Sequence, residues 1–241
     1  MAGPLSNLKM RFLNSGALLG LLGTPVCLLC GTSAADEGLC GDCRNDLPWL
    51  PAERCPTCAS PSPDSLTCGR CLTHPPALDR VEAAVAYAFP VDGLVQTLKY
   101  RHHLAAATVL GHLLAETVRD SPRPDLVIPV PLGEHRLRER GFNQSLEMAR
   151  VAARQLALTV EAESFRRIRD TPPQASLAFE ARAKNVRRAF VCDADLAGAR
   201  IAVVDDVLTT GASLNECARA LRKAGASEVV GWVAARTLLE A

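Results

Sequence analysis

Eight of the ten cysteines in this 241-residue chain form a repeat near the N-terminus, and no other feature limits the fold as strongly. Cys27–Cys30 and Cys40–Cys43 follow the pattern C-x2-C-x9-C-x2-C. The same pattern returns 28 residues later, at Cys55–Cys58 and Cys68–Cys71. A constant offset of this kind indicates two copies of one small structural unit.

The cysteine pattern predicts two structural zinc sites, one in each unit. Four thiolates complete the tetrahedral coordination of Zn²⁺, and the nine-residue spacer lets two C-x-x-C turns meet across a short hairpin, as in zinc ribbons. A closed four-cysteine site has no open position for a substrate, so these metals serve folding. Cross-bracing, in which the first cysteine pair joins the third, stays open. A redox role for the pairs is the less favoured alternative.

The proline-bearing stretch "THPPALD", residues 73–79, predicts a boundary between two parts of the chain. We expect an N-terminal segment over residues 1–24, a double zinc ribbon over 25–77 and a second domain over 78–241. The 27 basic residues nearly balance the 26 acidic ones, so net charge alone indicates neither a nucleic-acid binder nor an acidic tail.

The N-terminal stretch "KMRFLNSGALLGLLGTPVC" superficially resembles a secretory signal, but polar residues and glycines interrupt its apolar run. We expect no membrane insertion, because no segment reaches the roughly 20 consecutive apolar residues that a membrane span needs. Cysteine pairs that bind metal also favour a reducing compartment.

After residue 78, apolar runs alternate with stretches of helical periodicity. A short apolar run, "AAVAYAF", comes first, and strands are expected at "DLVIPVP", "SFRRI", "RIAVVDD" and "SEVVGWVAA". Helices are expected from Asp92 and over Leu104–Val118, Ser145–Leu158, Leu177–Arg188 and Ala212–Ala224. This alternation favours an α/β fold with a central parallel sheet, whose ligands bind at the carboxyl ends of the strands. We interpret "KYRHH", Lys99–His103, as a solvated helix end.

The stretch "VVDDVLTTGAS", residues 203–213, predicts a phosphate site at the end of a buried strand. Val207–Gly211 form the expected loop into the next helix, whose backbone N–H groups and dipole favour an anion. Thr209, Thr210 and Ser213 add hydroxyl groups to this cradle.

Two carboxylates, Asp205 and Asp206, precede the cradle. They provide acceptors for two neighbouring sugar hydroxyls, or negative charge for a metal that bridges those hydroxyls to a pyrophosphate. A ligand with a phosphate at one end, a diol in the middle and a pyrophosphate at the other fits this arrangement, and that ligand is phosphoribosyl pyrophosphate. A solvated aspartate pair at a strand end is the less favoured alternative.

These motifs carry a family resemblance. "IAVVDDVLTTGAS" is similar to the signature of type I phosphoribosyltransferases. The double zinc ribbon, "IPVPL", "RGFNQS", "R.R.TPPQASL" and "R.KNVRRAF" extend the resemblance to the ComF family of competence proteins, over about Pro25 to Arg236. The resemblance implies a type I phosphoribosyltransferase-like fold in a cytoplasmic protein linked to DNA uptake in transformation. It also implies Mg²⁺ with the phosphoribosyl pyrophosphate and a ComFA-like helicase as partner.

The resemblance also implies positions for the ligand. "PVPLGEHR", which begins at Val130, corresponds to a pyrophosphate loop, and residues 166–189 correspond to a mobile loop over the site. The residues expected to bind phosphoribosyl pyrophosphate are Pro131, Arg140, Asn143, Gln144, Arg182, Asp205, Asp206, Val207, Thr209, Thr210, Gly211 and Ser213.

Positive charge is concentrated between residues 166 and 188, where only Asp170 and Glu180 oppose it. The basic residues are Arg166, Arg167, Arg169, Arg182, Lys184, Arg187 and Arg188. Such cations stabilise a departing pyrophosphate. The alternatives are a solvated helix face and a track for single-stranded DNA, although few aromatic residues accompany the charges.

Three functions remain open from the sequence. The favoured one is a competence-associated protein that binds phosphoribosyl pyrophosphate and helps to handle incoming single-stranded DNA. The alternatives are a metabolic phosphoribosyltransferase of nucleobase salvage and a non-catalytic zinc-ribbon adaptor. The sequence identifies neither a general base nor residues that recognise a nucleobase, so the acceptor and the catalytic residues are unassigned.

Overall fold

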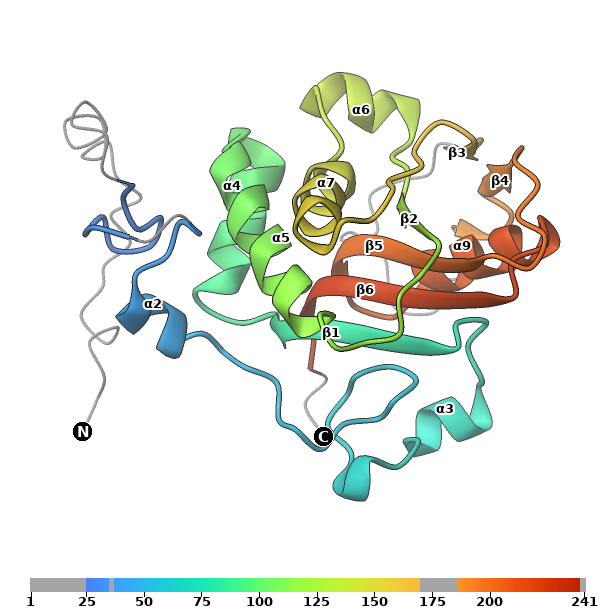
Figure 1. Ribbon diagram of the computed structural model, residues 1–241, viewed down its shortest axis with the longest axis horizontal. Coiled ribbons are helices and arrows are strands. Elements are labelled where there is room, and N and C mark those ends of the chain that lie inside the picture. Colours follow the sequence, from blue (N-terminus) through green and yellow to red (C-terminus); the bar gives the residue numbers. More distant parts are fainter. Residues whose placement is uncertain (1–24, 35–36, 170–185, 239–241) are drawn as a thin grey trace.

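The computed structural model describes residues 25–34, 37–169 and 186–238. Its centre is a four-stranded parallel sheet in the order β1-β6-β5-β2 (Figure 1). The strands are β1 (Arg80–Ala86), β2 (Leu126–Pro129), β5 (Arg200–Leu208) and β6 (Glu228–Arg236). The predicted α/β class with a parallel central sheet is confirmed.

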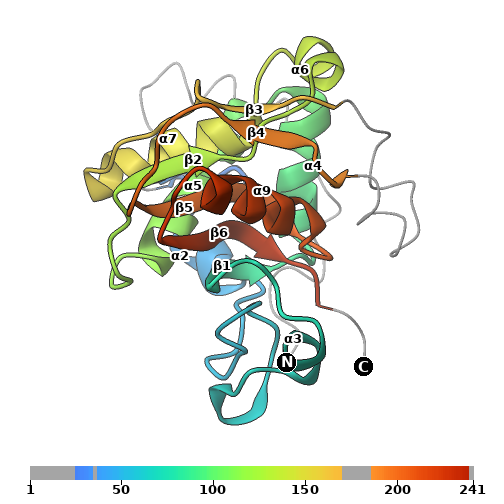
Figure 2. The ribbon, with the colours of Figure 1, turned by 90° about the vertical axis from the view of Figure 1, so that its right-hand side faces the viewer.

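Helices cover both faces of the sheet, as Figure 2 shows. One face carries α5 (Leu104–Thr117) and α7 (Gln144–Leu156), with α4 (Val91–Arg101) packed against α5. The other face carries α9 (Ala212–Lys223). A sheet covered on both faces explains why β5 and β6 are nearly continuous apolar runs.

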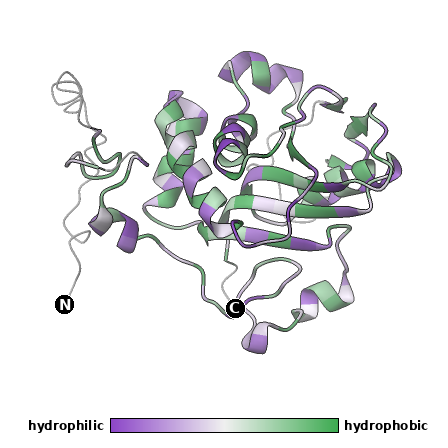
Figure 3. Cartoon of the chain, in the orientation of Figure 1, coloured by the Kyte–Doolittle hydropathy of each residue, from purple (hydrophilic) through white to green (hydrophobic). Residues whose placement is uncertain are grey.

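Strand β5 divides its side chains between the two cores. Ala202 and Val204 are buried with the residues of α5 and α7, whereas Ile201 and Val203 are buried with those of α9. This alternation follows from the two-residue period of a strand. Figure 3 shows hydrophobic residues along the central strands and hydrophilic residues on the outer helix α6 (Glu134–Arg140).

The end of β5 differs from the prediction. The strand continues to Leu208, because Asp205, Val207 and Leu208 remain paired with β6. The two carboxylates therefore lie within the last residues of the strand, and the loop before α9 is shorter than the predicted Val207–Gly211.

Two further features differ from the sequence-based expectations. The "PVPLGEHR" stretch, expected as a loop, continues into α6. The predicted strand at "SFRRI" is β3 (Phe165–Arg167), but it pairs antiparallel with β4 (Phe190–Cys192) in a separate sheet. The expected helix Leu177–Arg188 falls largely outside the described residues.

Two cysteine-rich units precede the sheet. The first zinc unit, residues 27–47, contains α2 (Gly41–Asn45), and the second zinc unit, residues 55–74, contains η3 (Pro63–Ser65) and α3 (Gly69–Thr73). Figure 1 places α2 on the side of α4 and α5, and α3 beyond β1. Among the described helices, none combines the length and hydropathy needed to cross a membrane.

Candidate functional site

A cavity of about 730 Å³ opens at the carboxyl ends of β2 and β5, where a parallel sheet places its ligands. The structure brings nine of the predicted ligand-binding residues to its wall: Pro131, Arg140, Gln144, Asp205, Asp206, Val207, Thr209, Gly211 and Ser213. The cavity therefore joins the two segments that the sequence analysis had singled out separately.

Three predicted site residues are not in this wall. The Asn143 side chain supports it from behind, since its Nδ2 donates to the carbonyl of Val130 at 3.1 Å and its Oδ1 accepts the N–H of Ser145 at 3.0 Å. The Thr210 hydroxyl accepts the N–H of Ala212 at 3.3 Å within the loop. Arg182 lies outside the described residues.

The two carboxylates are held by different partners. Asp205 Oδ1 accepts the Ser145 hydroxyl at 3.1 Å and the N–H of Asp206 at 2.9 Å. Asp206 Oδ1 accepts the N–H of Val207 at 2.9 Å, and its Oδ2 forms an ion pair with Lys99 of α4. Asp206 is almost fully buried, so Lys99 supplies the countercharge that a buried carboxylate needs.

Burial and the charge of its neighbour change how Asp205 holds a proton. Desolvation and the charge of Asp206 raise the pKa of Asp205 to about 7, although Lys99 and hydrogen bonds oppose the rise. Desolvation lowers the pKa of Lys99, but the attraction of Asp206 and Asp205 outweighs it and raises that pKa overall. Asp205 is thus poised between its charged and neutral forms near neutral pH.

Lys99 corrects an interpretation made from the sequence. The sequence pattern predicts a solvated helix end at Lys99, yet Lys99 lines the cavity and neutralises Asp206. The helical pattern of α4 marks its buried apolar face but gives no sign that a lysine beside that face meets an acidic strand end. Ser145 was likewise missed, although its place at the start of α7 was visible in the sequence.

Residues 209–213, the phosphate loop, turn sharply from β5 into α9. Gly211 adopts φ +81°, a left-handed conformation that glycine tolerates best. The first N–H groups of the 12-residue helix α9 follow directly. Together with the Thr209 and Ser213 side chains, they give this end of the cavity the character of an anion site.

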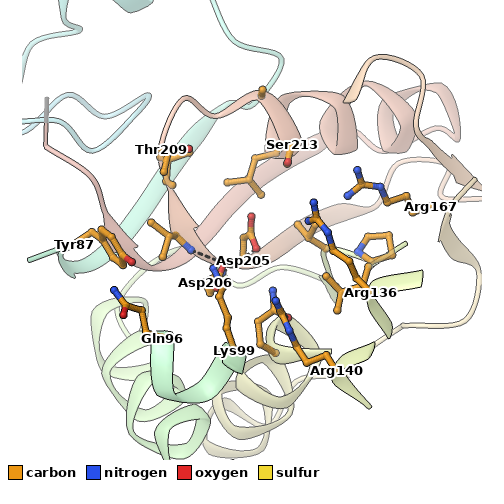
Figure 4. A pocket seen from close by; sticks show the side chains of 18 of the residues that line it. Tyr87, Gln96, Lys99, Arg136, Arg140, Arg167, Asp205, Asp206, Thr209 and Ser213 are labelled. Atoms are coloured by element: carbon orange, nitrogen blue, oxygen red, sulfur yellow. Dashed lines mark hydrogen bonds and ion pairs between the residues drawn. The ribbon is translucent and has the colours of Figure 1, made fainter. Parts of the chain in front are cut away.

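An arginine cluster, defined as Arg136, Arg140 and Arg167, also lines the cavity, and Figure 4 shows it on the side of Asp205 and Asp206 that faces away from Thr209. Arg140 donates to Gln144 Oε1 at 2.5 Å and lies 5.9 Å from the ring centroid of Tyr100. Burial lowers the pKa of Arg140.

Arg136 was not predicted from the sequence. Its Nη2 is buried and has no hydrogen-bond partner among the described residues. A buried donor of this kind is costly unless a ligand or water satisfies it. Arg136 therefore points to an anionic ligand at this end of the cavity.

The basic stretch near residues 166–188 reaches the cavity through Arg167 in its described part. Arg166 pairs with Asp193 instead, and Arg169 donates to the carbonyl of Arg187 at 3.0 Å. The backbone N–H of Arg188 donates a hydrogen bond to Glu216 Oε2 at 2.8 Å. Among the described residues of this stretch, Arg167 alone lines the cavity.

The eight repeated cysteines form two separate clusters. In each, the four sulfur atoms come from one unit and lie within 4.8 Å of one another, so cross-bracing is wrong. Cys30 and Cys40 Sγ are 3.6 Å apart, and Cys58 and Cys68 Sγ are 3.7 Å apart. Tetrahedral zinc with bonds of about 2.3 Å separates its sulfur ligands by roughly 3.8 Å, so both clusters fit the ion.

Comparisons with known proteins agree with both parts of the chain. A double zinc ribbon domain matches residues 18–72, and a phosphoribosyl transferase domain matches residues 97–236. The chain is 34% identical over 222 residues to the DNA utilization protein YhgH of Salmonella typhi, which covers 88% of this chain and 97% of that protein.

Two proteins named for competence are also similar. Competence protein F of Haemophilus influenzae is 32% identical over 212 residues, covering 84% of this chain and 92% of its own. Competence protein ComFC of Bacillus subtilis is 23% identical over 227 residues, and the match covers 83% of this chain and 90% of that protein. With its two four-cysteine units followed by a phosphoribosyltransferase domain, this chain belongs to the ComF family.

Proposed function

We propose that this protein binds phosphoribosyl pyrophosphate together with Mg²⁺ in the 730 Å³ cavity. The observation that carries the proposal is the order of groups along that cavity. Figure 4 shows Asp205 and Asp206 between Thr209 on one side and the side chains of Arg136 and Arg140 on the other. Two anion sites separated by hydrogen-bond acceptors match a ligand with a phosphate, a diol and a pyrophosphate.

The phosphate loop is the proposed site of the 5-phosphate. Backbone N–H groups at the start of α9 and the helix dipole attract the dianion without a buried counter-ion. The short connection between β5 and α9 fixes this site next to Asp205 and Asp206. A ribose attached to the phosphate therefore places its hydroxyl groups at the carboxylates.

Asp205 and Asp206 are the proposed acceptors for the ribose hydroxyls. Their oxygen atoms also fit Mg²⁺, which binds proteins through one or two carboxylates and completes its coordination with phosphate oxygens and water. When bound, the ion neutralises charge on the pyrophosphate. Lys99 is the positive charge that the carboxylates already have near them.

The arginine cluster is the proposed site of the pyrophosphate. Arg136 offers the buried Nη2 donor, and Arg140 is held towards the cavity by Gln144 and Tyr100. Preorganised positive charge of this kind also favours pentosyl transfer, because it stabilises pyrophosphate as the bond to the anomeric carbon breaks. The acceptor molecule for such a transfer has to be identified by experiment.

The biological role that we propose is natural competence, with the protein acting in the cytoplasm on incoming single-stranded DNA beside a ComFA-like helicase. Its support is the names of the relatives, which refer to competence and DNA utilization. Arg136 and Arg140 of α6, which line the cavity, are cations of the kind that contact DNA phosphates.

Calorimetric titration of phosphoribosyl pyrophosphate with Mg²⁺ into the zinc-loaded protein tests the ligand. We expect micromolar binding, and roughly hundredfold weaker binding after Asp205→Asn with Asp206→Asn, because two charged hydrogen-bond acceptors are lost. Asp193→Asn is the matched control, since Asp193 pairs with Arg166 away from the cavity and its loss leaves the affinity unchanged.

The outcomes separate the candidate functions. No binding by the folded, zinc-loaded protein refutes the proposal and leaves the adaptor function. Pyrophosphate release with one of a panel of nucleobases identifies a salvage transferase. Binding without turnover, combined with retention of labelled single-stranded DNA, supports the competence role.

A further inference from the structure

The two zinc units contact different parts of the phosphoribosyltransferase domain. The first unit packs on α5, where Arg44 pairs with Glu116 and Gly38 lies against Val109. The second unit reaches the end of β6 and the phosphate loop, through Arg236 and Arg70. Of these contacts, only those of the second unit reach the phosphate loop. The first unit therefore serves as a comparison within the same chain.

Arg236 connects the second unit to the phosphate loop directly. Its Nε donates to the carbonyl of Cys58 at 3.0 Å, and its Nη2 donates to the Ser60 hydroxyl at 2.9 Å. Its Nη1 donates to the carbonyls of Leu208 at 2.9 Å and Thr209 at 2.7 Å. Only 3% of this residue is exposed, so its bonds are made away from competing water.

Arg70 of α3 adds a second connection, because its Nη2 donates to the carbonyl of Thr210 at 3.1 Å. The carbonyls of three consecutive residues, Leu208 to Thr210, are therefore drawn towards the second unit. In a trans peptide the carbonyl and the following N–H point in opposite directions. The N–H groups of Thr210 and Gly211 are thereby turned away from the second unit, towards the side where an anion is proposed to bind.

A second cavity, of about 510 Å³, lies between the zinc unit and the loop. Cys58 and Cys71 line one side of it, and Leu208 and Gly211 line the other. Side chains do not fill this space, so the connection depends on the two arginines more than on continuous packing. The position of the Cys58–Ser60 turn, which the metal fixes, is then passed to the loop through Arg236.

We propose that Arg236 is a positioning residue through which the second zinc unit holds the phosphate loop in its anion-binding conformation. Zinc supplies the folding energy of such small units, so its loss from Cys55, Cys58, Cys68 and Cys71 releases the acceptors of Arg236. Occupancy of this site thereby controls affinity at the loop, and linkage requires that a ligand on the loop also raises the affinity of the second unit for zinc. The effect on affinity rests on the proposed function, whereas the effect on the loop does not.

Hydrogen exchange at residues 208–214 in the ligand-free, zinc-loaded protein is the first test. Arg236→Lys keeps the charge but lacks the planar fork that reaches both sides. We expect at least tenfold faster exchange in this segment, with two zinc ions still bound. Arg44→Lys is the matched control, because Arg44 joins the first unit to α5. This substitution is expected to leave hydrogen exchange in the loop unchanged. Equal exchange in the two variants overturns the proposal.

The second test removes the zinc from one unit at a time by a cysteine substitution. It takes the place of the first test if Arg236→Lys does not fold. Cys58→Ser and Cys30→Ser occupy equivalent positions in the two units. Cys58→Ser is expected to speed exchange in the loop, and Cys30→Ser to speed it near α5 only. Unchanged loop exchange in Cys58→Ser contradicts the coupling.

Affinity is measured last, with phosphoribosyl pyrophosphate and Mg²⁺ as the probe. If the parent binds, Arg236→Lys is expected to bind at least tenfold more weakly. In the parent, the ligand is expected to raise the chelator concentration that removes half of the zinc from the second site at equilibrium. A parent that does not bind refutes the proposed function, while the exchange data still decide on the coupling. A parent that binds while Arg236→Lys binds equally well refutes the coupling alone.

Discussion

At the scale of single residues, Asp205 links the site to pH. Its pKa, raised to about 7 mainly by burial and by Asp206, means that the folded protein binds a proton that the unfolded chain releases near pH 4. The associated stability is fully present below about pH 4 and is lost as the pH rises through 7. Folding and ligand binding therefore favour opposite protonation states of this carboxyl group.

Affinity for phosphoribosyl pyrophosphate with Mg²⁺ is expected to rise with pH, by up to about tenfold per unit below 7, and to level off above it, because the ligand needs the charged carboxylate. Calorimetry between pH 5.5 and 8.5 measures this. The ligand's own phosphates titrate near pH 6, so Asp205→Asn is the control that retains only their contribution. A parent profile identical to that of Asp205→Asn contradicts the assignment.

The residue scale also shows where sequence reasoning stops. The aspartate pair and the phosphate loop were predictable because their chemistry is contiguous in the chain. Lys99 and Arg136 were not, because each enters the cavity from a helix whose approach to β5 depends on tertiary packing. A charged side chain at the edge of a helix looks the same in sequence whether it faces solvent or a carboxylate.

At the scale of elements, the long apolar strands β5 and β6 and the helix α9 were predicted nearly to their ends, because pattern and burial agree over nine or more residues. The hairpin of β3 and β4 was not, since each strand has three residues and its partner lies beyond residues 170–185. The α6 helix was missed because it lacks a buried apolar face.

The phosphate loop depends on one backbone conformation, and Gly211→Ala tests it. A Cβ there lies 3.5 Å from Leu208 Cδ1, an ordinary contact, so the cost comes from the left-handed φ and is about 1 kcal/mol. We expect a small loss in the free energy of unfolding and a larger loss of phosphate affinity, about tenfold, because the loop N–H groups shift.

Gly41→Ala is the control for this substitution. Gly41 lies in α2 with no atom near the added Cβ, so alanine is tolerated there. Chemical denaturation and phosphate titration of both variants measure the two effects. Unaltered phosphate affinity in Gly211→Ala places the anion elsewhere in the cavity.

At the scale of the whole molecule, both zinc units contribute buried residues to the hydrophobic cores that flank the sheet. Cys27, Leu39, Cys43 and Leu47 of the first unit are buried in the same apolar cluster as α4 and α5. Ala59, beside the second unit's cysteines, is buried in the cluster that includes α9. The boundary proposed near residue 78 therefore separates two sequence segments that share their hydrophobic cores.

This sharing predicts that residues 78–241 alone are much less stable than the full chain. Truncation exposes the apolar surface of α5 that the first unit covers, at about 25 cal/mol for each Å² uncovered. We expect a lower Tm for the truncated chain, and one cooperative transition in the full zinc-loaded chain that moves down when a chelator removes both metals. Calorimetry of the three samples measures this. Two independent transitions in the full chain, with the upper one unmoved by the chelator, are incompatible with a shared core, and they identify the ribbon as a separable module.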